Sequence, residues 1–397
     1  MSSGENVKLK AHIDRLDVLR AISFLTVYSF HLAARFQHAN VPFTDGTFRD
    51  YSVWPKDALF LLPAGFGWIG VAFFYVLSGF CIHYATLHRR EKFSTRDFYG
   101  RRFLRIYPAY IVVVLVCTAL APWLPYKYFN VGQVVAHVFM VHNFLKSTIF
   151  GLDGVLWSLG VEMQFYLLYP LLLILARRWG GMDRCLVMGL VINVLGQLYL
   201  GYIKHGGWSP ISVTWSFPLM TWCDWILGVC VAEAYVAGRR VFHAENLWLV
   251  FSAVMLAASL EFRMLNAEGF LFGSVFFAVI LQRYLAVRVA LRWFERALIP
   301  VGVISYSLYL WHEPLMILVD RAGTKLGLTG TPWTHVAWDV LVTSVLLTVI
   351  AGASYYFLEV GAPKAIRRFM TRRHLHAPPL PGPATVHVFV APHHPSK

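Results

Sequence analysis

The strongest constraint in this sequence is a series of long apolar runs separated by short polar segments. Runs of about 17–25 mostly apolar residues are long enough to cross a bilayer as helices. Only 14% of the residues are charged and 57% are hydrophobic, whereas soluble domains carry roughly 25% charged residues. The chain is therefore predicted to be an all-α, polytopic membrane protein. Ten spans are expected, at about 17–36, 67–87, 106–124, 155–176, 185–202, 215–237, 247–261, 269–286, 299–319 and 335–358.

One further apolar segment, 131–147, is brief and is interrupted by His137, His142 and Asn143. We expect it to be interfacial or re-entrant, because counting it as a span would reverse every later loop. With ten spans, about 26 of the 35 Lys and Arg residues fall on one side of the membrane, as the positive-inside rule requires of the cytoplasmic side. Both termini are predicted to be cytoplasmic, in a bacterial inner membrane.

The same pattern divides the chain into three parts. Residues 1–14 form a polar cytoplasmic segment, residues 15–360 the transmembrane domain, and residues 361–397 a basic, then Pro- and His-rich cytoplasmic tail. A tail of this composition is expected to be disordered, because it buries too little apolar surface. The net charge of +14 is spread over short clusters between the spans, which argues against a nucleic-acid partner. The five cysteines lack the spacing of a disulfide or zinc framework, and no metal site is predicted.

Ionisable residues inside apolar runs are costly and are candidates for a functional site. Arg20 and His31 lie eleven residues apart, so both project from nearly the same face of the first helix. At 1.5 Å per residue, His31, Glu162 and His312 fall about 8, 10 and 12 Å below the outer surface. Asp224 lies at a similar level. These four side chains are expected to converge on one layer and face an internal cavity.

A basic cluster lies on the predicted cytoplasmic side, in the loop 88–105, which carries seven basic and two acidic residues. Arg102 and Arg105 are three residues apart and share a helix face, a spacing suited to clamping a phosphate group. Attraction to anionic lipid explains the same cluster equally well. The spacing alone leaves both interpretations open.

Five sequence blocks resemble the successive signatures of the acyltransferase-3 family of membrane acyltransferases. They occur in the family's order across about residues 15–360. The blocks are RLDVLRAI at 15–22 with His31 following, FFYVLSGF at 73–80, RRFLRIYP at 101–108, WSLGVEMQFY at 157–166 and ISYSLYLWH at 304–312.

This resemblance implies O-acylation, usually acetylation, of a carbohydrate or glycosylated acceptor, with acyl-CoA as cytoplasmic co-substrate and no permanently bound cofactor. The family's essential histidine and basic residue match His31 and Arg20. Its paired arginines match Arg102 and Arg105, and its Ser-x-x-x-Glu element matches Ser158 and Glu162. The sequence departs from the family at Val18 and Met163 and in the loosened ending at 359–363. It also ends without the extracytoplasmic domain that some members append, so a stand-alone type is expected.

The predicted mechanism uses His31 as general base on an acceptor hydroxyl, because imidazole has the unperturbed pKa nearest to neutrality. Glu162 is expected to orient the imidazole and stabilise its cation. An acyl-His31 intermediate remains an alternative. Supporting roles are assigned to Ser158 and Tyr306 near the acyl oxygen, and to His312, Asp224 and Asn143.

A rival from another class is a proton-coupled transporter or flippase, since intramembrane His, Glu and Asp also build proton relays. Pseudo-repeated broken helices would favour a transporter, and the sequence shows none.

Overall fold

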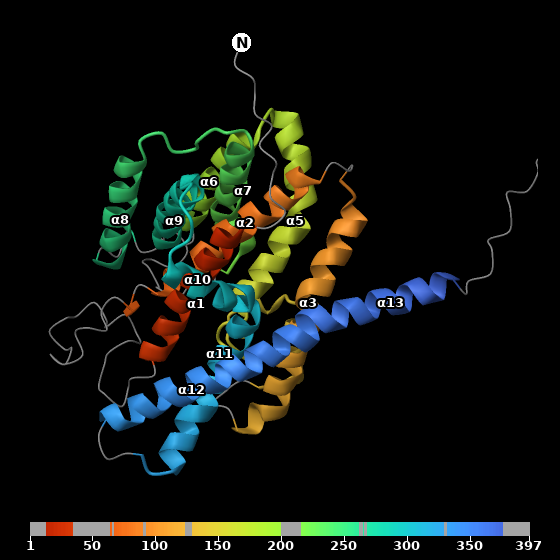
Figure 1. Cartoon of the computed structure of the whole chain (residues 1–397), viewed down its shortest axis with the longest axis vertical. Coiled ribbons are helices and arrows are strands. Elements are labelled where there is room, and N and C mark those ends of the chain that lie inside the picture. Colours follow the sequence, from red (N-terminus) through yellow and green to blue (C-terminus); the bar gives the residue numbers. More distant parts are fainter. Residues whose placement is uncertain are drawn as a thin grey trace, which may run out of the picture.

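The computed structural model describes residues 13–34, 64–65, 67–89, 93–123, 129–199, 216–261, 265, 268–328 and 332–375. Within these ranges every regular element is a helix and none is a strand, so the predicted all-α class is confirmed (Figure 1). The main helices are α1 (Asp14–Ala34), α2 (Gly70–His88), α3 (Thr95–Leu120), α4 (Val131–Val138), α5 (Trp157–Trp179), α6 (Met182–Leu198), α7 (Trp222–Val236), α8 (Glu245–Glu261), α9 (Gly269–Ala286), α10 (Trp293–Val303), α11 (Ser305–Lys325), α12 (Pro332–Ser354) and α13 (Ala362–Leu375).

Six helical stretches are long and apolar enough to cross a membrane, which makes this an integral membrane protein. Each of the ten predicted spans coincides with helical structure, although several of these helices are short. The count of ten therefore stays a prediction. The six stretches are Asp14–Ala33, Gly67–His88, Thr95–Leu120, Trp157–Trp179, Gly269–Ala286 and Trp333–Arg368.

The segment 131–147 is predicted not to span the bilayer, and it does not form one continuous helix. It contains the eight-residue α4 and a three-residue 3-10 turn, His142–Phe144. At 1.5 Å per residue, α4 spans only about 12 Å. The buried rings of His137 and His142 stack with their centroids 3.9 Å apart, which folds the segment back on itself.

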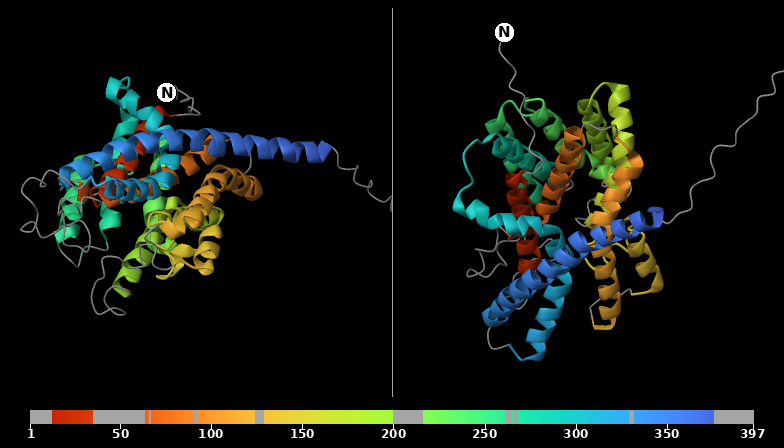
Figure 2. Two further views of the ribbon diagram at one scale, coloured as in Figure 1. Left: turned by 90° about the horizontal axis from the view of Figure 1, so that it is seen from below. Right: turned by 45° about the vertical axis from the view of Figure 1, so that its right-hand side comes forward.

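The predicted span 299–319 is wrong as a single helix, because the chain breaks at Ile304 between α10 and α11. Gly302 lies just before the break, where α10 meets α1. A Cβ atom there would lie 1.8 Å from the backbone oxygen of Asp17, so α10 is pressed directly against α1. Beyond Ile304 the chain takes a new direction as α11, as the right-hand view of Figure 2 shows.

Helices α2 and α7 form the tightest crossing of the core. A Cβ on Gly79 of α2 would lie 2.0 Å from the Trp225 carbonyl oxygen, and one on Gly228 of α7 would lie 2.0 Å from that of Val76. Small residues at a helix crossing let two backbones approach closely, which is the main source of attraction where lipid replaces water. Helices α1 and α9 also pack on α2, which holds it at the centre of the bundle.

Helices α11 and α12 form an antiparallel hairpin, and α12 continues through a π-helical turn, Tyr355–Gly361, into α13. This long helix crosses in front of α3 in Figure 1. Ser307 Oγ of α11 donates to Ser354 Oγ at 3.0 Å and to Glu359 Oε1 at 2.5 Å, which fixes the turn. The chain is helical as α13 over Ala362–Leu375, where no proline follows Pro363, and the disorder predicted for the tail 361–397 stays a prediction. Residues 376–397 lie outside the described part of the chain.

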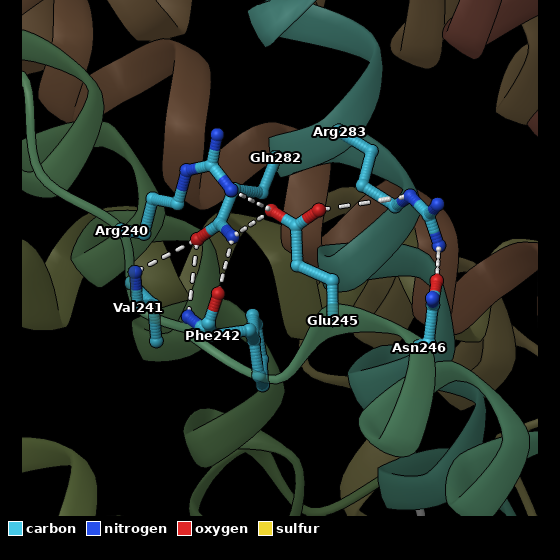
Figure 3. Close-up of polar contacts among 7 residues, drawn as sticks. All are labelled: Arg240, Val241, Phe242, Glu245, Asn246, Gln282 and Arg283. Carbon is cyan, nitrogen blue, oxygen red and sulfur yellow. Dashed lines mark hydrogen bonds and ion pairs between the residues drawn. The ribbon is translucent and has the colours of Figure 1, made fainter.

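A polar network ties the connection between α7 and α8 to the end of α9 (Figure 3). Gln282 Nε2 donates to Glu245 Oε1 at 2.6 Å, while Gln282 Oε1 accepts from the backbone N–H groups of Val241 and Phe242. Arg240 and Arg283 complete the network as ion-pair partners of Glu245, at 3.6 and 3.7 Å. The carboxylate of Glu245 at the start of α8 thus contacts both the α7–α8 connection and the end of α9.

Candidate active site

Arg20 of α1 is held in place inside the bundle by two neighbours. Its Nη1 donates to Asp17 Oδ1 at 2.6 Å, one turn earlier on the same helix. Its Nη2 donates to Cys81 Sγ of α2 at 3.1 Å. Asp17 is 1% exposed, so this buried carboxylate balances part of the arginine charge and fixes the direction of the guanidinium.

Two adjoining cavities meet around Arg20. The inner cavity has a volume of about 120 Å³ and is walled by α1, α2, α3, α5, α10 and α11. The outer cavity has a volume of about 580 Å³ and is walled by α1, α2, α3, the end of α10 and the π-helical turn. Arg20, Cys81, Arg102, Arg105 and Val303 line both. Three of these five shared residues are arginines, and the carboxylates of Asp17, Glu162 and Glu359 line the same cavities, so the junction places basic side chains beside acidic ones.

Arg102 and Arg105 come from the first turns of α3, which begins where the Ser94 Oγ accepts a hydrogen bond from the Asp97 N–H at 3.3 Å. Arg102 also borders a third, smaller cavity. Its guanidinium lies 5.8 Å from the ring centroid of Tyr166 on α5. Arg102 and Arg105 line the same two cavities, as their shared helix face predicts, with Arg102 half-buried and Arg105 exposed.

Glu162 and Ser158 of α5 line the inner cavity, where Tyr306 and Tyr309 of α11 face them. Glu162 accepts a short hydrogen bond from the Tyr166 hydroxyl. The Ser158 and Tyr309 hydroxyls lie 2.7 Å apart. The Tyr306 hydroxyl donates to the backbone oxygen of Ile106 at 2.9 Å, so this residue also joins α11 to α3.

His31 lies near the far end of α1, outside the residues that line the cavities. Its Nδ1 is 3.4 Å from Glu313 Oε2 of α11, with the two side chains 25% and 12% exposed. The buried ring of His312 lies 5.2 Å from the His31 ring, centroid to centroid. The predicted meeting of His31 and His312 in one layer is therefore found. The predicted Glu162–His31 pairing is not, because the carboxylate against His31 is Glu313, the neighbour of His312.

Tyr309 connects the cavity with the histidines. Its hydroxyl lies in the inner cavity beside Ser158, while its ring lies 5.3 Å from the ring of His312. Its backbone oxygen is 2.6 Å from His312 Nδ1. These contacts place one aromatic side chain between the arginine-lined cavity and the His31–Glu313 pair.

Two predicted supporting residues lie elsewhere. Asn143 exchanges two hydrogen bonds with Gln164, at 2.9 and 2.8 Å, and so anchors the re-entrant segment on α5. Asp224 is fully buried in α7, with the Cys223 thiol 3.9 Å from its Oδ1. Neither residue lines the two cavities around Arg20. The predicted convergence of four ionisable groups thus holds for His31 and His312, while Glu162 lies in the inner cavity and Asp224 in the helix packing.

Sequence reasoning missed Glu313 and Tyr309. Glu313 satisfies the criterion that selected Glu162, since it is an acid inside a predicted apolar span, and it directly follows the block at 304–312. Tyr309 carries no such signal, because aromatic residues are common throughout the spans.

Curated relatives of this chain are O-acetyltransferases. It is 24% identical over 399 aligned residues to the peptidoglycan O-acetyltransferase OatA of Listeria monocytogenes, covering 89% of this chain and 56% of that protein. It is 26% identical over 335 residues to the O-acetyltransferase OatA of Staphylococcus aureus, covering 75% of this chain and 53% of that protein. The chain thus spans little more than half the length of these relatives. No solved structure matches it significantly.

The family comparison covers most of the chain. The family described as an acyltransferase domain matches residues 13–355. This range contains all the arginines of the two cavities, together with His31, Glu162, Tyr309 and Glu313. The chain therefore belongs to the acyltransferase-3 family of membrane acyltransferases.

Proposed function

We propose that this protein is a membrane O-acetyltransferase that moves an acetyl group from acetyl-CoA to a hydroxyl of a carbohydrate acceptor. The observation that carries the proposal is the continuity of the site. A cavity lined by Arg20, Arg102 and Arg105 leads to Tyr309, and Tyr309 contacts the His31–His312–Glu313 cluster. In this proposal the donor enters from the arginine-lined cavity, the acceptor comes from the side of His31, and Tyr309 lies between them.

The charge and the size of the two cavities favour acyl-CoA as the donor that they bind. Guanidinium groups bind phosphate oxygens through charge-assisted, often bidentate hydrogen bonds. The outer cavity of about 580 Å³ suits the nucleotide of CoA, and the inner cavity of about 120 Å³ suits its thioester arm. Because the arginines face these cavities, a phosphate ligand explains Arg102 and Arg105 better than attraction of the loop to a lipid surface.

The chemical step is assigned to His31. Its Nδ1 faces Glu313, so Nε2 is the nitrogen that takes the proton from the acceptor hydroxyl. The hydroxyl oxygen attacks the thioester carbonyl, a C–O bond forms, the C–S bond breaks, and CoA leaves as the thiol after it takes up a proton. Glu313 stabilises the imidazolium formed on the way. Ser158 and Tyr309 hydroxyls support the acyl oxygen from the inner cavity.

The acceptor class rests on the relatives, one of which is named for peptidoglycan. We infer a carbohydrate hydroxyl as acceptor, presented from the side of the membrane where α1 ends at His31. We further propose a bacterial inner membrane as its location, with both termini on the cytoplasmic side, as the distribution of basic residues predicts.

The test is transfer of radiolabelled acetyl from acetyl-CoA to a peptidoglycan fragment in proteoliposomes containing the purified protein. We expect label on the sugar with the wild type and none with His31→Ala, while binding of acetyl-CoA to the variant stays within about twofold of wild type. Normal turnover by the His31→Ala variant would falsify the assignment of the base.

The same assay addresses a proton-coupled transporter or flippase, which would move unmodified substrate across the vesicle membrane without labelling it. Membership of an acyltransferase family favours the enzyme. Movement of unlabelled acceptor together with an absence of acetylated product would support the transporter instead.

A further inference from the structure

A second group of imidazole and carboxylate side chains lies on the α11–α12 hairpin. Asp320 comes from α11, and His335 and Asp339 come from α12. One ligand atom from each residue lies within 4.8 Å of the other two. Asp320 follows Glu313 by seven residues on α11, about 10.5 Å along the helix axis. The group is thus separate from the His31–Glu313 pair and takes no part in the proposed transfer.

The three side chains are arranged around one nitrogen. His335 Nε2 lies 3.3 Å from Asp320 Oδ1 and 3.7 Å from Asp339 Oδ1. Both distances exceed the 2.7–3.2 Å that is typical of N–H···O hydrogen bonds. They are close to the separation of ligand atoms in a tetrahedral metal site, which is about 3.3–3.6 Å for bonds of 2.0–2.2 Å.

Burial makes a cation at this position favourable. The side chains of His335 and Asp339 are 2% and 4% exposed, whereas Asp320 is 25% exposed. A divalent cation offsets the negative charge of the two carboxylates and takes an imidazole nitrogen as a further ligand. The partly exposed Asp320 gives such an ion a way into the site.

A glycine allows α11 and α12 to approach each other closely. Gly323 of α11 faces α12, where a Cβ would lie 3.1 Å from His335 Nε2 and 2.8 Å from Trp338 Cδ1. Trp338 Nε1 donates to the backbone oxygen of Val319 at 3.0 Å. His335 and Asp339 are four residues apart, so they share the face of α12 that meets α11.

We propose that Asp320, His335 and Asp339 form a binding site for a divalent transition-metal ion, with Zn²⁺ as its preferred occupant. An imidazole ligand disfavours Mg²⁺ and Ca²⁺, which prefer sites made only of oxygen. Three protein ligands leave a fourth position for water. The bound ion cross-links α11 and α12 near their connecting turn.

The experiment uses the purified full-length chain in detergent, stripped with EDTA, exposed to Zn²⁺ and freed of excess metal. Bound zinc is measured by inductively coupled plasma mass spectrometry, and affinity by titration. We expect about one Zn²⁺ per wild-type chain and at least a tenfold loss of affinity in His335→Gln and Asp339→Asn. Glu313→Gln and the exposed-site control Asp183→Asn are expected to bind zinc as the wild type does.

A second measurement needs no variant, so a misfolded variant cannot decide the question. Co²⁺ added to the stripped wild type should give the visible absorption of a tetrahedral nitrogen–oxygen site, and Zn²⁺ should remove it. Three results would overturn the proposal. The first is an absence of stoichiometric zinc in the wild type, which is expected if the group is an ion pair with a protonated His335. The second is unchanged zinc binding in both ligand variants. The third is a loss of zinc only in Glu313→Gln.

Discussion

Two glutamates, Glu162 and Glu313, are candidates to orient His31, and they lie in different parts of the structure. Glu313 lies 3.4 Å from His31, whereas Glu162 lies in the arginine-lined cavity with Tyr166. If Glu313 orients the base, Glu313→Gln should lower kcat by about 100-fold or more, with little change in KM for acetyl-CoA. Steady-state kinetics in proteoliposomes measure both constants. A larger kcat loss in Glu162→Gln, with Glu313→Gln near wild type, would restore the pairing predicted from the sequence.

Substitution of the arginines should affect KM more than kcat, because they are proposed to bind a part of the donor that does not react. Arg105→Ala should raise KM for acetyl-CoA by about 10- to 100-fold, the equivalent of one charge-assisted hydrogen bond, with a smaller change in kcat. Arg96→Ala, on the exposed face of the same helix, is the control and should leave KM unchanged. Equal effects of the two substitutions would point to a general loss of positive charge at the membrane surface.

The sequence predicts the depth of a side chain along its helix, but not the direction in which that side chain points. Depth along a helix follows from 1.5 Å per residue, and it brought His31 and His312 to the same layer. The choice of carboxylate depends on how each helix is rotated about its axis, which is set by packing. Glu162 and Glu313 both satisfy the depth argument, and only the arrangement of α1 against α11 distinguishes them.

At the scale of helices, the α2–α7 crossing makes the sharpest demand on the sequence. Gly79→Ala would place a methyl group against the Trp225 carbonyl, where a Cβ lies at 2.0 Å. We expect a loss of about 1–3 kcal/mol or more in stability, because the two backbones must separate. Gly100→Ala is the matched control, since a Cβ there meets no atom within 4 Å. Thermal unfolding in detergent compares the two, and equal melting temperatures would contradict the close-packed crossing.

A second helix-scale prediction concerns the network of Figure 3. Gln282→Leu removes the acceptor of two backbone N–H groups and the donor to Glu245. Buried backbone donors left without a partner cost about 1–3 kcal/mol each. The connection between α7 and α8 should therefore become sensitive to protease while the rest of the fold persists. Unchanged proteolysis at residues 237–244 would show that the network contributes nothing to the order of this connection.

The sequence located the helices well and their interruptions poorly. Apolar runs are read from composition, and each of the ten runs contains helical structure. The break at Ile304 follows Pro300 and Gly302, yet both residues are accommodated within α10, so neither marks the break by itself. It lies beside the contact of Gly302 with the backbone of Asp17, and these two residues are 285 positions apart in the sequence. Such long-range contacts are invisible to a pattern of apolar residues.

For the whole molecule, the predicted ten spans place the loop before α3 in the cytoplasm and the α11–α12 turn outside. Single cysteines at Arg96 and Lys325 should therefore react with a membrane-impermeant maleimide from opposite sides of the membrane. The unmodified chain sets the baseline, because four of its cysteines are buried and Cys81 is half-buried. Labelling of both positions from the same side would exclude ten spans with an inside N-terminus.

The shared arginine junction of the two cavities has a consequence for turnover. Under the proposed function, Arg20, Arg102 and Arg105 hold groups that are identical in acetyl-CoA and in the CoA that remains after transfer. Contacts of this kind stabilise the spent donor as well as the fresh one and do not lower the barrier between them. If acetyl-CoA is the donor, as proposed, free CoA is expected to inhibit the enzyme, and its rate in the cell is expected to follow the ratio of acetylated to free coenzyme instead of the concentration of either.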